Sequence, residues 1–204
     1  MCAKKDSDPS FNYWLDESLA GNFRNWLTDL DLVCENRSSL ASVSSCYFLG
    51  FGLGLLLMFY PDLLGRKKTM VLLLVPYVIF TQLTIYSASL TGKKIGFFMQ
   101  GLLHLKITLS YTHMFELTDE ASKDFCATVI NMTDSLTMFI IGFCLKYLVA
   151  DAILIVQVAN AVGIIAIILY IFLVPESPKW LILNQRFKEG VRTLNYISRL
   201  NGCS

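Results

Sequence analysis

The sequence predicts an all-α integral membrane protein, and its composition and long uncharged segments are the reasons. Of its 204 residues, 54% are hydrophobic, and the mean hydropathy is +0.53. The hydrophobic residues lie in runs of about 20, the length that a helix needs to cross the hydrocarbon core of a bilayer. A soluble domain does not require uncharged runs of this length.

Five segments are expected to span the membrane as helices. They are Leu40–Tyr60, Thr69–Leu90, Ile95–Phe115, Phe125–Val149 and Ile153–Val174. The short connections between them are typical of antiparallel neighbours in a helical bundle. The chain therefore divides into three predicted regions, which are a polar segment over residues 1–38, a five-helix transmembrane bundle over 39–174 and an amphipathic tail over 175–204.

A basic turn between the first two spans orients the chain. Arg66, Lys67 and Lys68 follow one another in this turn, and Lys and Arg are enriched in cytoplasmic loops. Near the span ends, eight Lys and Arg lie on the side of this turn and five on the other, namely Arg24, Arg37, Lys93, Lys94 and Lys146. The turn and the tail are thus predicted to be cytoplasmic, and residues 1–38 non-cytoplasmic.

Two local patterns indicate how the helices pack. In the first span, small residues recur every four positions at Ser42, Cys46, Gly50 and Gly54, a spacing that lets two membrane helices approach closely. In the tail, an apolar helical face is expected to lie along the inner membrane surface or against the bundle. Its members are Phe187, Val191, Leu194 and Ile197. Trp180 is expected to anchor the tail at the membrane interface.

The sequence contains none of the common signatures of an enzyme. It has no Gly-rich phosphate loop, no GxSxG and no HExxH motif, so we expect that the protein is not an enzyme and needs no cofactor. Its six cysteines show no spacing that predicts a metal site. A net charge of +1 gives no basic excess for binding nucleic acid.

Several segments resemble motifs of the major facilitator superfamily. Residues 62–67 (DLLGRK) resemble the D-R-x-G-R-R/K loop that joins the second and third helices of that superfamily. Residues 175–181 (PESPKWL) resemble the PESPRWL segment after the sixth helix in its sugar-porter and organic-cation-transporter branches. Residues 27–34 (LTDLDLVC) resemble the TEWDLVC stretch before the second helix of organic cation/anion transporters. Residues 116–123 resemble, more weakly, the end of the fourth helix.

The resemblance implies helices two to six of a twelve-helix fold, which is a half-bundle without the first helix. It also implies two groups of functional residues at the cytoplasmic side. The gating loop comprises Asp62, Gly65, Arg66 and Lys67. The inner-face motif comprises Glu116, Lys123, Glu176, Ser177, Pro178 and Trp180.

Three positions depart from the pattern of the superfamily. Met58 and Leu63 stand where the loop has Gly and Arg, and Phe97 is aligned with an arginine of the fourth helix that pairs with the loop aspartate. In the superfamily, this charge cluster holds the two halves closed in one state of the transport cycle. The departures therefore predict a weakened latch around Asp62.

Polar residues within the predicted spans suggest a path for substrate or protons, because buried charges are costly in a membrane. They are Lys106, Ser110, His113, Asn131, Asp134, Gln157 and Asn160. A second interpretation is structural, with a Lys106–Asp134 pair or hydrogen bonds between helices holding the bundle together. The sequence leaves both interpretations open.

Two functions follow from these patterns. The first is a solute transporter of the organic-ion or sugar class, incomplete for alternating access by itself, because that mechanism needs two half-bundles around a midplane site. The alternative is a repurposed, non-transporting accessory subunit of a larger membrane complex. The expected partners are the lipid bilayer, a small organic solute and a protein, which is a second half-bundle, a second copy or a larger complex. Both the plasma membrane and an organelle membrane, such as the mitochondrial inner membrane, fit the sequence.

Overall fold

The computed structural model describes residues 25–30, 32, 35–148 and 151–202, and every regular element in these ranges is helical. The longer helices are α3 (Arg37–Leu55), α5 (Arg66–Tyr86), α6 (Leu90–Leu102), α7 (Leu105–Leu117), α8 (Lys123–Tyr147), α9 (Ala152–Leu173) and α11 (Phe187–Leu200). The shorter ones are α2 (Trp26–Asp29), α4 (Tyr60–Leu64), the 3₁₀ helix η2 (Glu120–Ser122) and α10 (Pro178–Leu183). Most of the predicted polar segment 1–38 lies outside the described residues.

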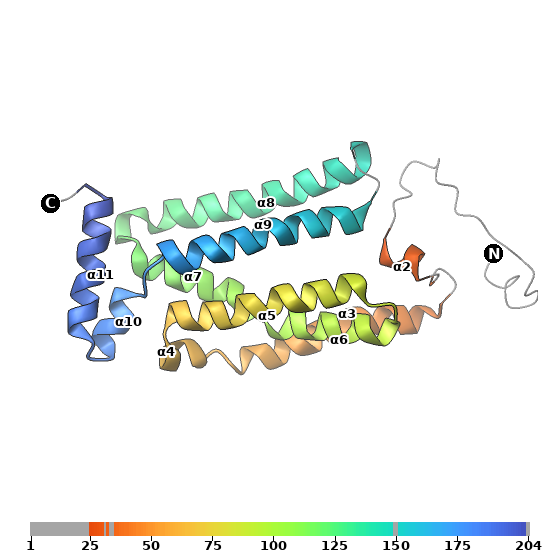
Figure 1. Ribbon diagram of the computed structural model, residues 1–204, viewed down its shortest axis with the longest axis horizontal. Coiled ribbons are helices and arrows are strands. Elements are labelled where there is room, and N and C mark those ends of the chain that lie inside the picture. The colour runs from red at the N-terminus through yellow and green to blue at the C-terminus, as the bar shows by residue number, and fades with distance from the viewer. Residues whose placement is uncertain (1–24, 31, 33–34, 149–150, 203–204) are drawn as a thin grey trace, which may run out of the picture.

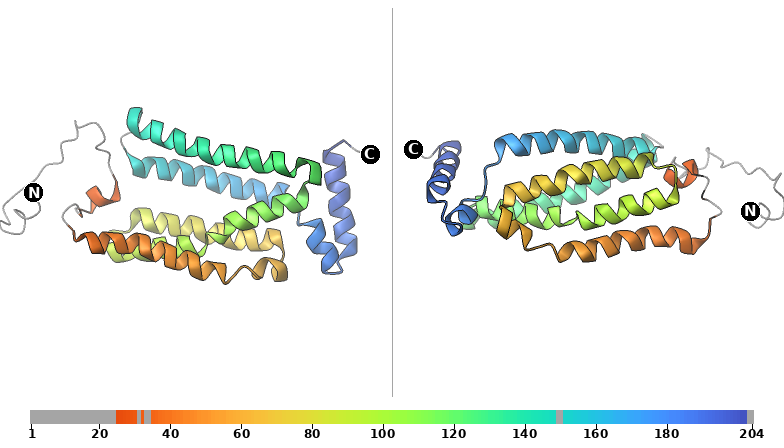
Figure 2. Two further views of the ribbon diagram at one scale, coloured as in Figure 1. Left: turned by 180° about the vertical axis from the view of Figure 1, so that it is seen from behind. Right: turned by 60° about the horizontal axis from the view of Figure 1, so that its bottom comes forward.

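The long helices lie side by side as a bundle (Figure 1). At one end of it, α4 and the start of α5 meet the end of α7 and helix α10. We call this end of the bundle the basic end, because it carries the turn with Arg66, Lys67 and Lys68. Helix α11 lies there across the direction of the bundle (Figure 2), as expected for a tail helix that runs along a membrane surface.

Within the described residues, four helices have the length and composition of membrane spans, and they match four of the five predicted segments. The third predicted span, residues 95–115, is divided between α6 and α7, which together run along the bundle with a bend between them (Figure 1). At the bend, the N–H groups of His104, Lys106 and Ile107 donate to carbonyls three residues earlier. This tighter 3₁₀ pattern interrupts the α-helix.

Helices α3 and α6 are in backbone contact, as the small residues of the first span predict. A Cβ atom added to Gly50 would lie 2.1 Å from the carbonyl oxygen of Phe98, and one added to Gly54 would lie 2.6 Å from that of Leu102. From the other side, a Cβ atom on Gly101 would lie 2.0 Å from the carbonyl oxygen of Tyr47. Only glycine fits at these three positions, so the close packing of these two helices depends on the glycines.

Lys93, expected as one of five loop cations, is instead part of the packed structure. Only 2% of its surface is exposed. Its ammonium group donates hydrogen bonds to the carbonyl oxygens of Thr84 (2.6 Å) and Ile85 (3.0 Å). These carbonyls belong to the last turn of α5, where backbone acceptors lack partners and a cation is favourable. Lys93 therefore caps the C-terminal end of α5.

The tail differs from its prediction at Trp180. This side chain is 7% exposed and packs within the basic end, so it is not an interfacial anchor. The apolar face of α11 is largely open, since Phe187, Val191 and Leu194 are each exposed. Near the start of α11, Gly190 lies against Leu181 and Ile182 of α10, which joins the two tail helices.

Candidate functional site

The predicted gating loop is a tight turn between α4 and α5, and Gly65 makes it. Gly65 ends α4 and precedes α5 with a φ of 102°, a conformation that side chains disfavour. A Cβ atom at this position would also lie 2.7 Å from Oε2 of Glu176. Two independent constraints, one of conformation and one of space, therefore require glycine here.

Arg66 connects the loop to the end of α7. Its guanidinium group donates to both carboxylate oxygens of Glu116, with Nε–Oε2 and Nη2–Oε1 distances of 3.2 and 3.1 Å. It also forms an ion pair with Asp62, one helical turn earlier. The side chains of Arg66 and Glu116 are only 13% and 10% exposed, whereas that of Asp62 is 70% exposed. The Arg66–Glu116 pair is therefore the buried part of this network.

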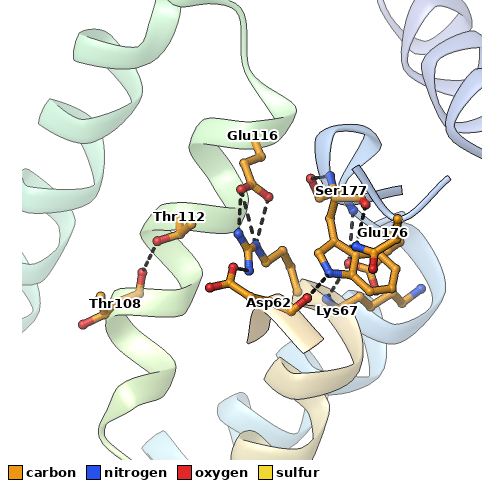
Figure 3. A network of polar contacts seen from close by, with 10 residues as sticks. Asp62, Lys67, Thr108, Thr112, Glu116, Glu176 and Ser177 are labelled. Carbon is orange, nitrogen blue, oxygen red and sulfur yellow. Dashed lines mark hydrogen bonds and ion pairs between the residues drawn. The ribbon is translucent and has the colours of Figure 1, made fainter. Parts of the chain in front are cut away.

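Glu176 and Trp180 fasten the tail to the same loop (Figure 3). The carboxylate of Glu176 accepts hydrogen bonds from the backbone N–H groups of Lys67 (2.8 Å) and Ser177 (3.1 Å). The indole Nε1–H of Trp180 donates to the carbonyl oxygen of Asp62 at 2.7 Å. Ser177 is fully buried, and its hydroxyl accepts the N–H of Trp180 to begin α10. Pro178 is the buried first residue of that helix.

The charge of Glu116 is stabilised by its neighbours. Burial alone would raise the pKa of this carboxyl, but hydrogen bonds from Arg66 and Ser177 and the positive charges of Arg66 and Lys179 hold the pKa below its ordinary value. Glu116 follows the third predicted span, at the basic end. Its carboxylate therefore stays ionised and keeps Arg66 in place.

We call Asp62, Arg66, Glu116, Glu176 and Trp180 the basic-end cluster. It brings the predicted gating loop and most of the inner-face motif together, and Asp62 keeps an ion pair with Arg66. The weakened latch stays a prediction. The place assigned to Phe97 is wrong, because Phe97 packs near Trp26, at the opposite end of the bundle. Lys123 stands apart from the cluster and pairs with Glu120 at the start of α8.

The polar residues of the predicted substrate path make contacts between helices, and most of their partners are tyrosines. The Nζ atom of Lys106 lies 3.0 Å from the ring centroid of Tyr77, so it does not pair with Asp134. The other contacts are His113 Nδ1 with the Tyr170 hydroxyl at 2.6 Å, Tyr111 with Asn131 at 3.1 Å, and Gln157 with Tyr86 at 3.1 Å. The hydroxyl of Ser110 bonds the carbonyl of Ile107 within its own helix.

Besides Ser110, two members of the predicted path make no contact of this kind. Asp134 is exposed on α8, a helix that buries none of its residues. Asn160 of α9 is 7% exposed, and its amide nitrogen has no hydrogen-bond partner among the described residues. Four of the seven residues of the predicted path thus join helices, and Ser110, Asp134 and Asn160 do not.

Sequence reasoning missed the tyrosine partners. Tyr77 and Tyr111 lie in the middle of α5 and α7, whereas Tyr170 lies in the last turn of α9 and Tyr86 ends α5, where interfacial tyrosines are expected. A tyrosine inside a span needs a partner for its hydroxyl group. This requirement could have predicted that these tyrosines contact polar residues of other helices. It does not show which polar residue will be that partner.

Known transporters are similar to this chain over most of its length. It is 26% identical over 178 residues to "Solute carrier family 22 member 1" of Bos taurus, which covers 86% of this chain and 31% of the relative. It is 28% identical over 191 residues to "Solute carrier family 22 member 7" of Mus musculus, covering 86% and 32%. It is 26% identical over 200 residues to "Steroid transmembrane transporter SLC22A24" of Homo sapiens, covering 97% and 36%.

The chain spans about a third of the length of the curated relatives that it matches. A family model described as "Sugar (and other) transporter" matches residues 12–202, which include the loop at 62–67, the helical bundle and the tail motif at 175–181. The chain therefore belongs to the sugar (and other) transporter family of the major facilitator superfamily.

Proposed function

We propose that this chain forms one half-bundle of a membrane transporter for small organic solutes, which cross between it and a second half-bundle. Membership of the family supports transport. Alternating access requires two bundles that rock about a site between them. The second bundle would come from further sequence of a longer polypeptide, a second copy or a partner protein.

One observation carries this proposal, which is the exposure of Asp134 in the middle of α8. Helix α8 has the length and composition of a membrane span, yet no residue in it is buried. Placing a carboxylate at the centre of a membrane helix costs about 3 kcal/mol. An aspartate at this position is therefore expected to face a polar cavity or a protein partner rather than lipid.

The surroundings of Asp134 favour an organic cation as the solute. A shallow cavity of 830 Å³ on α8 is lined in part by Thr128, Asn131 and Ser135, which are polar but neutral. Asp134 does not line this cavity, but it is the one ionisable residue from 128 to 136 of the same helix. The nearest mid-span cation in sequence, Lys106, is placed over Tyr77 instead. A second half-bundle that covers both this cavity and the neighbouring side of α8 with Asp134 would enclose a site with a negative charge.

The basic-end cluster is proposed to act as a latch in this cycle. Arg66, Glu116 and Glu176 come from three separate segments, and their contacts are ion pairs and hydrogen bonds that water can replace. Such contacts hold one arrangement of the helix ends without making it permanent. They therefore suit an interface that opens and closes during transport.

Uptake measurements test the proposal directly. Cells that express the protein should take up a quaternary ammonium ion such as tetraethylammonium, whereas the purified 204-residue chain alone in liposomes should not. Asp134→Asn should reduce this uptake at least tenfold in the cells, since it removes the charge that attracts the cation. Asp134→Glu keeps the charge and should retain most of the activity.

Two controls separate this proposal from its alternatives. Asp124→Asn makes the same substitution in the first turn of α8, outside this cavity, and should have little effect. A sugar analogue is offered in parallel, and uptake of the sugar without the cation would contradict the assigned solute class. Normal cation uptake by the Asp134→Asn variant would contradict the role given to this residue. Recovery in a stable membrane complex without uptake would favour the accessory-subunit function.

A further inference from the structure

A second cavity lies next to the basic-end cluster, between the start of α5 and helix α11, and Glu176 belongs to both. Its volume is 590 Å³. Lys67 and Lys68 line it from α5 and Arg192 lines it from α11, while Val71 and Leu72 form an apolar wall next to the lysines. The cavity thus joins two elements that are far apart in the sequence, and it has a cationic side and an apolar side.

The lining has an excess of positive charge that the described protein does not neutralise. It contains four cations and two carboxylates, which leaves a net charge of +2 (4 − 2). Both carboxylates are engaged, because Glu189 pairs with Arg186 and Glu176 accepts two backbone N–H groups. Lys67, Lys68 and Arg192 form no ion pair with any residue in the described ranges.

The apolar wall continues along α5 as an exposed stripe. Leu72, Val75, Ile79 and Leu83 recur at helical spacing on one face, with exposed fractions of 60%, 43%, 59% and 44%. Because α5 has the length and composition of a membrane-spanning helix, this face is suited to contact acyl chains. The cationic cavity therefore lies at the end of an apolar stripe that runs into the membrane.

We propose that this cavity binds the headgroup of an anionic phospholipid, with the phosphate near Lys67, Lys68 and Arg192 and an acyl chain along the stripe on α5. Anionic lipids are enriched in the cytoplasmic leaflet, the side on which the positive charges predict this turn to lie. A lipid bound there holds α11 against α5 through charges that would otherwise repel one another. The proposal concerns the lipid alone and does not depend on transport.

Titration of lipids onto the purified 204-residue chain in neutral detergent tests this site, with bound lipid counted by native mass spectrometry. Phosphatidylserine should bind at least tenfold more tightly than phosphatidylcholine. Each Lys or Arg near an anionic surface contributes about fivefold to binding. The triple variant Lys67→Gln, Lys68→Gln, Arg192→Gln should therefore weaken phosphatidylserine binding about 100-fold.

A matched control removes the same charge from the same end of the molecule. Lys179→Gln, Lys188→Gln and Arg199→Gln lie outside this cavity, and this triple variant should bind phosphatidylserine within about threefold of the unaltered chain. The charge-preserving variant Lys67→Arg, Lys68→Arg, Arg192→Lys should also retain binding. Helix content measured by circular dichroism establishes that each variant is folded.

Three results would overturn the proposal. Equal weakening by the two Gln triple variants would show attraction to net charge rather than binding in this cavity. Equal affinity for phosphatidylserine and phosphatidylcholine would show that the cations do not recognise the headgroup. Displacement of the lipid by an equal concentration of glycerophosphoserine, which has no acyl chains, would assign the cavity to a soluble anion.

Discussion

Two regions of the bundle differ in how their helices are packed. Helices α3 and α6 are in close backbone contact, whereas α8 leaves its surface open. In the first, Gly50, Gly54 and Gly101 allow backbone contact and leave no room for any side chain. In the second, a span-length helix buries nothing and carries an exposed aspartate. The α3–α6 contact is therefore satisfied within this chain, whereas the surface of α8 is the one that we propose faces a polar cavity or a protein partner.

The largest loss of stability is expected from filling the α3–α6 contact. Gly50→Leu should lower the free energy of unfolding by about 3 kcal/mol, because its side chain would meet backbone atoms that cannot move aside. Gly52→Leu is the matched control, since a Cβ atom at Gly52 meets nothing within 4 Å. Unfolding of both variants in mixed micelles checks this, and equal losses would contradict the assigned contact.

Removing the cation of the basic-end cluster should have the next largest effect. Arg66→Ala should cost about 2 kcal/mol, because the nearly buried carboxylate of Glu116 loses its charged hydrogen bonds. Arg186→Ala breaks a similar pair with Glu189, but those side chains are 41% and 50% exposed. An exposed pair contributes little, so this control should stay within about 0.5 kcal/mol. The same unfolding measurement compares them, and a larger loss from Arg186→Ala would refute the cluster's role.

The hydrogen bond between the tail and the loop should contribute less. Trp180→Phe keeps an aromatic ring but removes the N–H that donates to the carbonyl of Asp62. A net loss of about 1 kcal/mol is expected. Trp26→Phe, at the other end of the bundle, should change stability by less than about 0.5 kcal/mol. The midpoint of thermal unfolding of each variant measures the difference, and no difference between them would show that this bond is dispensable.

The smallest effect on stability is expected at Asp134. Asp134→Asn should leave the free energy of unfolding of the 204-residue chain within about 0.5 kcal/mol of the original, because this side chain is exposed and pairs with none of the described residues. Its effect should be seen in uptake instead. A large change in the stability of the chain itself would show that Asp134 makes an internal contact, and the contrast between the two regions would fail.

Much of the fold could be predicted from the sequence, because hydrophobic run length specifies membrane helices directly. The helix that includes Pro76 extends over residues 66–86, close to the predicted 69–90, and the small residues of the first span correctly indicate tight packing. The division of the third span at Leu103–His104 was not predictable from hydropathy. It depends on backbone bonding that leaves the composition of the segment unchanged.

The candidate site was predicted in its members but not in its contacts. The resemblance placed the gating loop and the inner-face motif at the same side of the membrane, yet it did not show that Glu176 accepts the backbone N–H of Lys67. Such a bond depends on the position of the backbone rather than on residue identity. Lys93 was misassigned for a similar reason, because a cation beside a span can close a helix as readily as it can face water.

The water accessibility of α8 is the most direct test of the proposal that Asp134 faces a polar cavity rather than lipid. Ser135→Cys is introduced beside Asp134 in a protein whose native cysteines are replaced by serine, and Ile79→Cys on α5 serves as the control. In cell membranes, a charged, water-soluble thiol reagent should label position 135, and a tetraalkylammonium ion should slow that labelling, whereas position 79 should react only with a lipid-soluble maleimide. Labelling of position 135 by the lipid-soluble reagent alone would place this part of α8 against lipid and contradict the proposed polar cavity.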